Sequence, residues 1–284
     1  MKNYKLIENV TSGKEREFYH FDHTRFENIR ITGEEDGESA FKECRFIEVN
    51  NSYFDLRYPF WHCYDIVLNN IEATERCRGP FWYCRDIYIK NMKSTGVKAF
   101  RECVDILLVN SIFESEEIGW RCENFSINNC KITAKYPFFE SKHLSIDGLT
   151  LTGKYSFQYV EHGIVANSHF DTKDAFWHAK DVIVKDTTII GEYLGWYSEN
   201  LTLINCVIKG TQPLCYCKNL KLVDCKFIDS DLAFEYSEVN GNIIGEILSI
   251  KNPISGELVV DNCLEYINDE NSRINGFILK PNKK

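Results

Sequence analysis

Three charged residues carry the clearest chemical signal in this sequence. Glu102, Arg121 and Glu140 follow one another at a constant interval of about 19 residues, which is short enough for one unit of a structural repeat. Two carboxylates on either side of a sugar can act as a general acid and a general base. A guanidinium can bind a substrate carboxylate through two parallel hydrogen bonds. We therefore take Glu102 and Glu140 as a candidate acid–base pair, with Arg121 between them as the third candidate catalytic residue.

Aromatic and imidazole rings occur at equivalent intervals. Tyr83 precedes Glu102 by one such interval, and His62 precedes Tyr83 by a slightly longer one. Tyr197 follows Glu102 by five of these intervals. Flat rings with a polar tip suit contact with sugars, so His62, Tyr83 and Tyr197 are candidate ligand-binding residues. The alternative is a surface ladder of opposite charges on neighbouring strands, which does no chemistry.

The same interval runs through most of the chain. Residues 59–70 read Pro-Phe-Trp-His-Cys-Tyr-Asp-Ile-Val-Leu-Asn-Asn, and residues 80–91 read Pro-Phe-Trp-Tyr-Cys-Arg-Asp-Ile-Tyr-Ile-Lys-Asn. A short repeat with alternating apolar positions is typical of a solenoid in which each repeat forms one coil. The coils align on a polar anchor, with steps of 21, 19, 19, 19, 20, 18, 19 and 19, at Asp65, Asp86, Asp105, Asn124, His143, Gly163, Asp181, Asn200 and Asn219.

Each coil has the same order of residue types. The first and third positions after the anchor are apolar, as in Ile87 and Ile89, which predicts a short strand with one buried face. The fifth position is mostly Asn or Asp, as in Asn91, and such residues tolerate left-handed backbone at corners. Two positions before the anchor, a Cys such as Cys84 or a small residue suits a tight inner position.

Two aromatic columns precede the cysteines. All five tryptophans fall four positions before the anchor, so strand alternation places them inward with the cysteines. The same alternation predicts an outward phenylalanine stripe, through which the chain would form a homo-oligomer. This stripe consists of Phe60, Phe81, Phe100, Phe138 and Phe176.

These columns predict an all-β protein, a single-stranded right-handed parallel β-helix with coils of about 19 residues. We expect one domain over residues 1–284, with an N-terminal cap and first coils in 1–40, regular coils in 41–240 and a C-terminal cap in 241–284. A strict six-residue period, which a left-handed hexapeptide helix needs, is absent. A pentapeptide-type helix fits less well, because the Pro-Phe-Trp-x-Cys segment breaks a five-residue rhythm.

The repeated Pro-Phe-Trp-x-Cys-x-Asp/Asn-Ile/Leu-x-Leu units resemble an uncharacterised bacterial family grouped with the pectin-lyase-like β-helices. The resemblance covers nearly the whole chain. It implies the fold and no activity, so no catalytic residue is carried over from it.

Composition limits the partners. A net charge of −9 disfavours a nucleic-acid partner, and no stretch approaches the length of a membrane span. The first residues lack a signal-peptide pattern, so we expect a cytoplasmic protein. The twelve cysteines then predict free thiols, and Cys215 with Cys217 is only a weak metal signal. We expect no metal and no cofactor.

Three functional hypotheses follow. The first is a binder or enzyme acting on oligosaccharide at an outward face, with lyase-like or glycoside hydrolase-like activity if it is an enzyme. The second is a non-catalytic scaffold or protein-interaction solenoid. The third is a thiol-based or metal-binding protein. A groove with clustered carboxylates and exposed aromatic residues would favour the first hypothesis, and a flat stripe without such a groove would favour the second.

Overall fold

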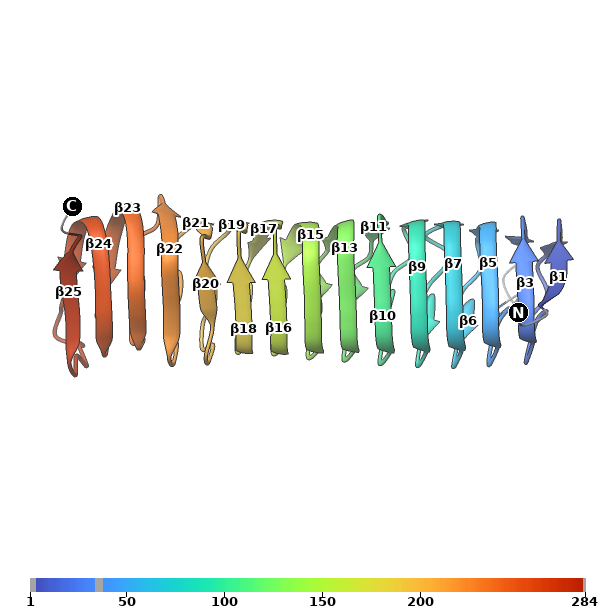
Figure 1. Cartoon of the computed structure of the whole chain (residues 1–284), viewed down its shortest axis with the longest axis horizontal. Coiled ribbons are helices and arrows are strands. Elements are labelled where there is room, and N and C mark those ends of the chain that lie inside the picture. The colour runs from blue at the N-terminus through green and yellow to red at the C-terminus, as the bar shows by residue number, and fades with distance from the viewer. Residues whose placement is uncertain (1–3, 34–37, 283–284) are drawn as a thin grey trace. The chain divides into compact units, whose positions relative to one another are not determined.

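The computed structural model describes residues 4–33 and 38–282. The chain forms two compact units, Met1–Lys142 and His143–Lys284. Within each unit the strands of successive coils lie side by side and run in the same direction, and the coils wind in a right-handed sense (Figure 1). The described residues contain no helix. The predicted right-handed parallel β-helix is therefore confirmed.

The strands of the first unit are β1 (Lys5–Glu8), β2 (Thr11–Ser12), β3 (Asp22–Glu27), β4 (Arg30–Ile31), β5 (Arg45–Phe54), β6 (Phe60–Trp61), β7 (Tyr64–Ala73), β8 (Phe81–Trp82), β9 (Arg85–Ser94), β10 (Val104–Val109), β11 (Ile112–Glu114), β12 (Glu117–Ile118), β13 (Glu123–Ala134) and β14 (Tyr136–Pro137). The strands of the second unit are β15 (Lys142–Lys154), which begins at the last residue of the first unit, β16 (Glu161–Ala166), β17 (His169–Lys173), β18 (Lys180–Lys185), β19 (Thr188–Ile190), β20 (Thr202–Ile204), β21 (Val207–Lys209), β22 (Leu220–Ile228), β23 (Val239–Lys251), β24 (Gly256–Ile267) and β25 (Phe277–Pro281).

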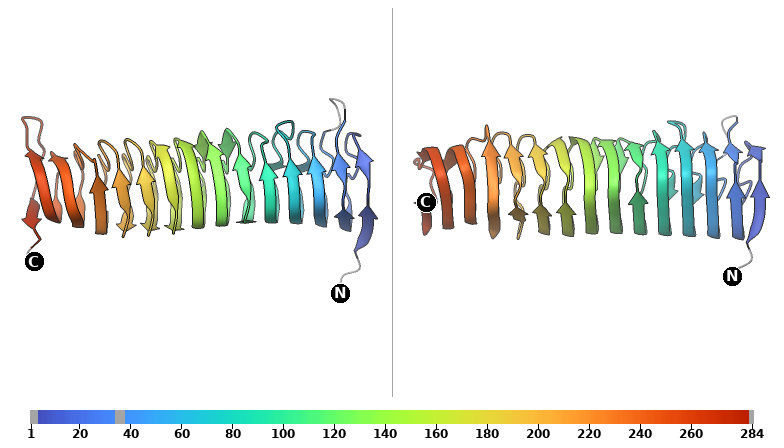
Figure 2. Two further views of the ribbon diagram at one scale, coloured as in Figure 1. Left: turned by 90° about the horizontal axis from the view of Figure 1, so that it is seen from above. Right: turned by 45° about the horizontal axis from the view of Figure 1, so that its top comes forward.

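The strand register follows the sequence interval. Ile87 pairs with Ile106, and Ile106 pairs with Phe125, in parallel strands. These three side chains are at most 2% exposed, so the first aliphatic column lies in the core as predicted. Turned views show the same stacking of short strands on more than one side of each unit (Figure 2). Each coil buries its apolar side chains against the coils before and after it.

At least four left-handed residues shape a typical coil. In the coil around Asp105, the backbone φ is 60° at Lys98, 50° at Glu102, 58° at Asp105 and 50° at Asn110. Each left-handed residue turns the chain, and the residue after it points inward. Asn and Asp tolerate this conformation, and their side chains bond along the stack, as when Asn124 Nδ2 donates to Asp105 Oδ1 at 2.8 Å.

The predicted orientation of the phenylalanines is wrong. Phe60, Phe81, Phe100, Phe138 and Phe176 are all at most 1% exposed. Several stack on one another inside, with ring centroids 4.7 Å apart between Phe81 and Phe100. The left-handed residue three positions before the anchor interrupts strand alternation, so the phenylalanine and the cysteine on either side of it both point inward. The tryptophans are half-buried at the surface instead, and a homo-oligomer cannot form through a phenylalanine stripe.

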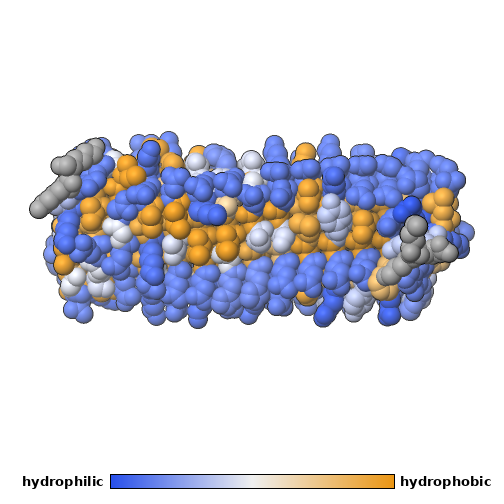
Figure 3. Space-filling model, in the orientation of Figure 1, coloured by the Kyte–Doolittle hydropathy of each residue, from blue (hydrophilic) through white to orange (hydrophobic). Residues whose placement is uncertain are grey.

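One predicted anchor is also wrong. His162, with φ of 57°, lies one interval after His143 and one interval before Asp181, so it occupies the corner assigned to Gly163. Gly163 consequently occupies the inward-facing position after the corner, and Ile164, at the next position, is 52% exposed. Apolar side chains gather in a band on the face of the long strands, between hydrophilic rows (Figure 3).

Strands near both ends of the described residues also join the coils, since β1 pairs with β3 and β25 pairs with β24 in parallel. All twelve cysteines are free, as predicted, and all but Cys263 are buried. Burial raises the pKa of thiols such as Cys77, which keeps them protonated and unreactive.

Candidate functional site

Five of the six candidate residues form one column in the first unit, which we call the surface column. Its members are the left-handed residues that precede the cysteines or their equivalents in five consecutive coils. Backbone N–H groups link each coil to the next, as when His62 N donates to Trp82 O and Glu102 N donates to Trp120 O. The surface column consists of His62, Tyr83, Glu102, Arg121 and Glu140.

The charged end of the surface column is an ion pair beside a second acid. Arg121 Nε donates to Glu140 Oε2 at 2.7 Å, and the two side chains are 53% and 41% exposed. This hydrogen bond raises the pKa of Arg121, with the charges of Glu140 and Glu102 adding to the effect. The guanidinium thus lies between two carboxylates as the sequence indicated, but it is already bound to one of them.

The other end of the surface column is aromatic. The rings of His62 and Tyr83 are stacked, with centroids 5.0 Å apart and planes 14° apart. His62 also lies 11° from the plane of Trp61, at 6.1 Å. The first unit therefore presents a ring pair, an acid and an ion pair in sequence along one edge.

A second column, missed as a site, runs alongside. The guanidinium of Arg101 lies 5.4 Å from the ring centroids of both Trp82 and Trp120, a cation–π arrangement. The indole N–H groups of these tryptophans donate to Lys98 O and Tyr136 O. The sequence could have indicated this column, because Arg101 is a cation within the tryptophan column, and a cation between two indoles is a specific surface arrangement.

Tyr197, the sixth candidate, belongs to the second unit. It is part of a stack of rings at the corresponding position, which we call the aromatic ladder: Tyr159, His178, Tyr197 and Tyr216. Successive centroids are 4.8, 5.0 and 4.7 Å apart, and the planes differ by 5°, 9° and 11°. The sequence pattern missed Tyr159, because the anchor at Gly163 shifted it into the tryptophan column.

The ladder ends at a tilted ring. Tyr236 follows Tyr216 at 5.8 Å with planes 43° apart. Its hydroxyl donates to Asn271 O, and the guanidinium of Arg273 lies 4.7 Å from its ring. The segment around residues 271–273 therefore covers Tyr236, whereas Tyr159 and Tyr197 are 47% and 45% exposed.

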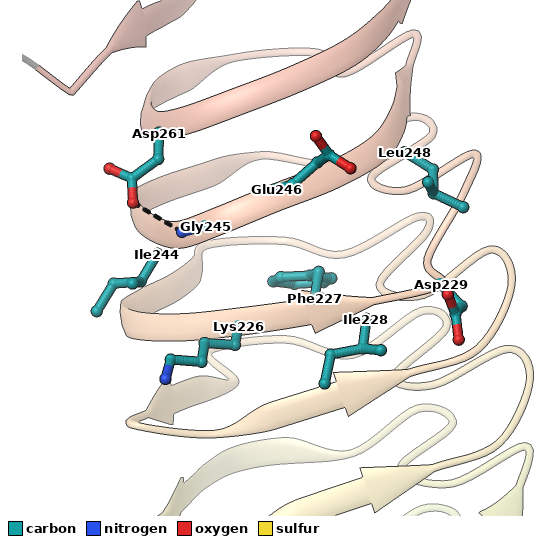
Figure 4. Close-up of a pocket in the computed structure, with 9 residues that line it drawn as sticks. All are labelled: Lys226, Phe227, Ile228, Asp229, Ile244, Gly245, Glu246, Leu248 and Asp261. Carbon is teal, nitrogen blue, oxygen red and sulfur yellow. Dashed lines mark hydrogen bonds between the residues drawn. The ribbon is translucent and has the colours of Figure 1, made fainter.

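Three surface hollows lie elsewhere. The largest, of about 500 Å³, forms where the strand register shifts between β22, β23 and β24 (Figure 4). Its carboxylates already have partners, since Asp261 accepts from Gly245 N at 2.8 Å and Asp229 pairs with Lys209. Hollows of about 350 and 420 Å³ lie beside Ile164 and beside Tyr53. No candidate site residue lines any of these three.

Neither a group of metal-ligating side chains nor a helix of membrane-spanning length is found in the described residues. No group of three or more His, Cys, Asp or Glu within residues 4–33 and 38–282 is arranged to hold a metal ion. The same residues include no helix long and apolar enough to cross a membrane.

The stacked parallel coils define a β-solenoid protein. The chain belongs to a family of proteins of unknown function, DUF3737, whose sequence model matches residues 5–277. No curated protein matches the sequence.

Two solved structures are similar at low identity. One is PfbA, a surface adhesin of Streptococcus pneumoniae, with a TM-score of 0.48, 9% identity, and coverage of 84% of this chain and 80% of that chain. The other is the A-module of the mannuronan C-5 epimerase AlgE4 of Azotobacter vinelandii, with a TM-score of 0.26, 10% identity, and coverage of 95% and 89%. Neither likeness bears on the activity of this chain.

Proposed function

We propose that the first unit binds a carbohydrate along the surface column and catalyses no reaction on it. One observation carries the proposal: five consecutive coils place rings, carboxylates and a guanidinium in one row of exposed and half-buried side chains. Successive members of the row lie about 4.8 Å apart, the distance between neighbouring strands. An oligosaccharide lying along the row would meet a polar group at each coil.

The chemistry of the row suits a hydroxyl-rich ligand. Glu102 and Glu140 can accept hydrogen bonds from hydroxyl groups, and Arg121 can donate to hydroxyl or carboxylate oxygens. Trp82 and Trp120 add half-buried apolar surface beside them. Because Arg121 already satisfies Glu140, a ligand would bind with little rearrangement of the ion pair.

Binding fits this geometry better than hydrolysis. A general acid at neutral pH needs a raised pKa, which burial or a neighbouring negative charge supplies. Glu140 is instead bound by a cation, and the side chains of Arg121 and Glu140 are 53% and 41% exposed. Water is not excluded from such a surface, so the electrostatic stabilisation that catalysis requires would be screened.

A panel of neutral and acidic oligosaccharides tests this proposal by isothermal titration calorimetry and by release of reducing ends. Glu102→Gln and Arg121→Gln should each weaken binding at least about tenfold while the melting temperature stays nearly unchanged. Glu114→Gln is the matched control, because Glu114 is an exposed acid of the same unit on β11. It should bind as the wild type does.

Two results would count against the proposal. If none of the oligosaccharides bound the wild-type protein, carbohydrate would be excluded as the ligand. Release of reducing ends that Glu102→Gln and Glu140→Gln abolish would establish an enzyme instead of a binder. A protein-interaction solenoid is the second candidate function, favoured by the aromatic ladder of the second unit, since Tyr and Trp are enriched at protein interfaces.

A further inference from the structure

The aromatic ladder presents ring edges, not ring faces. Neighbouring planes lie within 11° of parallel at centroid distances of 4.7 to 5.0 Å, so each inner ring has both faces covered by its neighbours. What remains for a partner is a straight row of ring edges and hydroxyl groups. The rings are also held in place by stacking, so little side-chain entropy would be lost when the ladder is covered.

A row of alternating charges runs beside the ladder, two positions further along each coil. We call it the charge row: Glu161, Lys180, Glu199 and Lys218. Its members pair in register through the backbone on successive coils. Lys180, Glu199 and Lys218 form no ion pair with another residue in the described part of the chain. These three charges are exposed and available to a second molecule.

We propose that a second copy of this chain covers the ladder, packed antiparallel about a two-fold axis that passes between Lys180 and Glu199. In this arrangement Lys180 faces Glu199 of the other copy, and Glu161 faces Lys218. Every charge in the row then meets its opposite, and each pair occurs twice by symmetry. His178 lies opposite Tyr197 in the same way.

Two features of the row select this partner. The groups of a ligand with a different repeat distance would no longer lie opposite the charge row after a few coils. A second copy has the same spacing of about 4.8 Å. An in-register parallel arrangement would set Lys180 against Lys180 and Glu199 against Glu199, which costs binding energy. Only the antiparallel two-fold arrangement is both self-complementary and closed.

The size of the surface sets the strength of the dimer. Four rungs extend over about 15 Å, so the contact is smaller than the roughly 800 Å² per partner of a standard interface. The dimer is therefore reversible and depends on protein concentration. It goes beyond the proposed carbohydrate binding, with which it shares no residue.

Sedimentation velocity of the full chain over a wide concentration range tests the dimer. The wild type should shift from monomer to dimer as concentration rises, and high salt should oppose the shift. Lys180→Glu and Glu199→Lys should each raise the dimer dissociation constant at least about tenfold, because like charges then face each other across the axis. An equimolar mixture of the two variants should dimerise as the wild type does, since the carboxylate introduced in one variant then faces the ammonium group introduced in the other.

Lys185→Glu is the matched control, an exposed lysine at the end of β18 and outside the charge row. It should leave the dissociation constant unchanged. A wild type that stays monomeric at every concentration would overturn the proposal, and so would single variants that dimerise like the wild type. Failure of the mixture to restore the dimer would show that the variants act in another way, and would overturn the antiparallel pairing.

Discussion

Replacing Asp86 with asparagine should stabilise the protein. Asp86 lies between Asp65 and Asp105 at the same corner of three successive coils. Its pKa is raised, first by desolvation and then by the two neighbouring carboxylates. Asparagine removes this repulsion and provides a donor to Asp65, as Asn124 does to Asp105 at 2.8 Å.

The magnitude follows from these contacts. Like charges on neighbouring strands cost about 0.2–1 kcal/mol per pair, and solvent reduces the cost at this exposed corner. With the added hydrogen bond, Asp86→Asn should raise the free energy of unfolding by about 1 kcal/mol at pH 7. For a domain of this size, that corresponds to an increase of about 2–4 °C in the melting temperature.

The gain should depend on pH with a definite sign. A carboxyl whose pKa is raised on folding destabilises the native state above that pKa, because the folded protein then holds an unfavourable charge. The advantage of Asp86→Asn should therefore be largest at neutral pH. The part of the gain that comes from removing the charge should shrink as the pH falls through the raised pKa and disappear below the ordinary value of 3.8. Thermal unfolding followed by circular dichroism at several pH values measures this.

Asp181→Asn is the control. Asp181 occupies the same corner in the second unit, but it accepts from Asn200 Nδ2 at 2.6 Å and pairs with His162. Removing its charge removes favourable partners, so no stabilisation is expected. Equal shifts in the two variants, or no gain from Asp86→Asn at pH 7, would refute the argument.

Two further predictions test the packing. Phe100→Ala should lower the free energy of unfolding by about 3–5 kcal/mol, whereas Ile164→Ala should cost less than about 1 kcal/mol; urea unfolding distinguishes them, and a large cost for Ile164 would contradict its outward position. Titration with a thiol reagent should find twelve thiols after denaturation. In the native protein Cys263 should react first, and a denatured count lower by pairs would indicate disulfides.

The regular parts of the fold could be predicted because the same repeat interval separates equivalent residues of successive coils. Once Ile87 and Ile106 are one interval apart, parallel pairing in register places every equivalent residue in a column. The surface column follows from the same arithmetic, which is why Glu102 and Glu140 lie one coil to either side of Arg121. The ion pair itself could not be foreseen, because side-chain conformation decides which acid Arg121 binds.

The orientation of the phenylalanines could not be predicted from alternation. Alternation holds within a strand, and a left-handed residue such as Glu102 ends it without any turn residue to mark the place. Glycine, asparagine and aspartate mark such corners in a sequence, but histidine, tyrosine, glutamate and arginine do not. For the same reason Tyr159 was not recognised as part of the aromatic ladder.

That unusual choice of residues leads to a final prediction. Left-handed backbone costs an ordinary L-residue about 1–2 kcal/mol, and asparagine and aspartate, common at the next two corners of each coil, adopt it more readily. Long side chains at the costlier corner indicate that reach and chemistry matter there more than stability. Glu102→Asn should therefore raise the free energy of unfolding by about 0.5–1 kcal/mol, the equivalent of the several-fold preference of asparagine for this conformation.

The same substitution should weaken oligosaccharide binding, since the shorter side chain loses the carboxylate beside Arg121. Asp181→Asn provides the comparison, because Asp181, with φ of 55°, is an acid that already suits left-handed backbone, and its side chain pairs with Asn200 and His162 and not with another acid. Urea unfolding and calorimetry on the same samples measure both quantities. A loss of stability in Glu102→Asn would mean that glutamate is there for the fold, and the surface column would then be a structural ladder rather than a binding site.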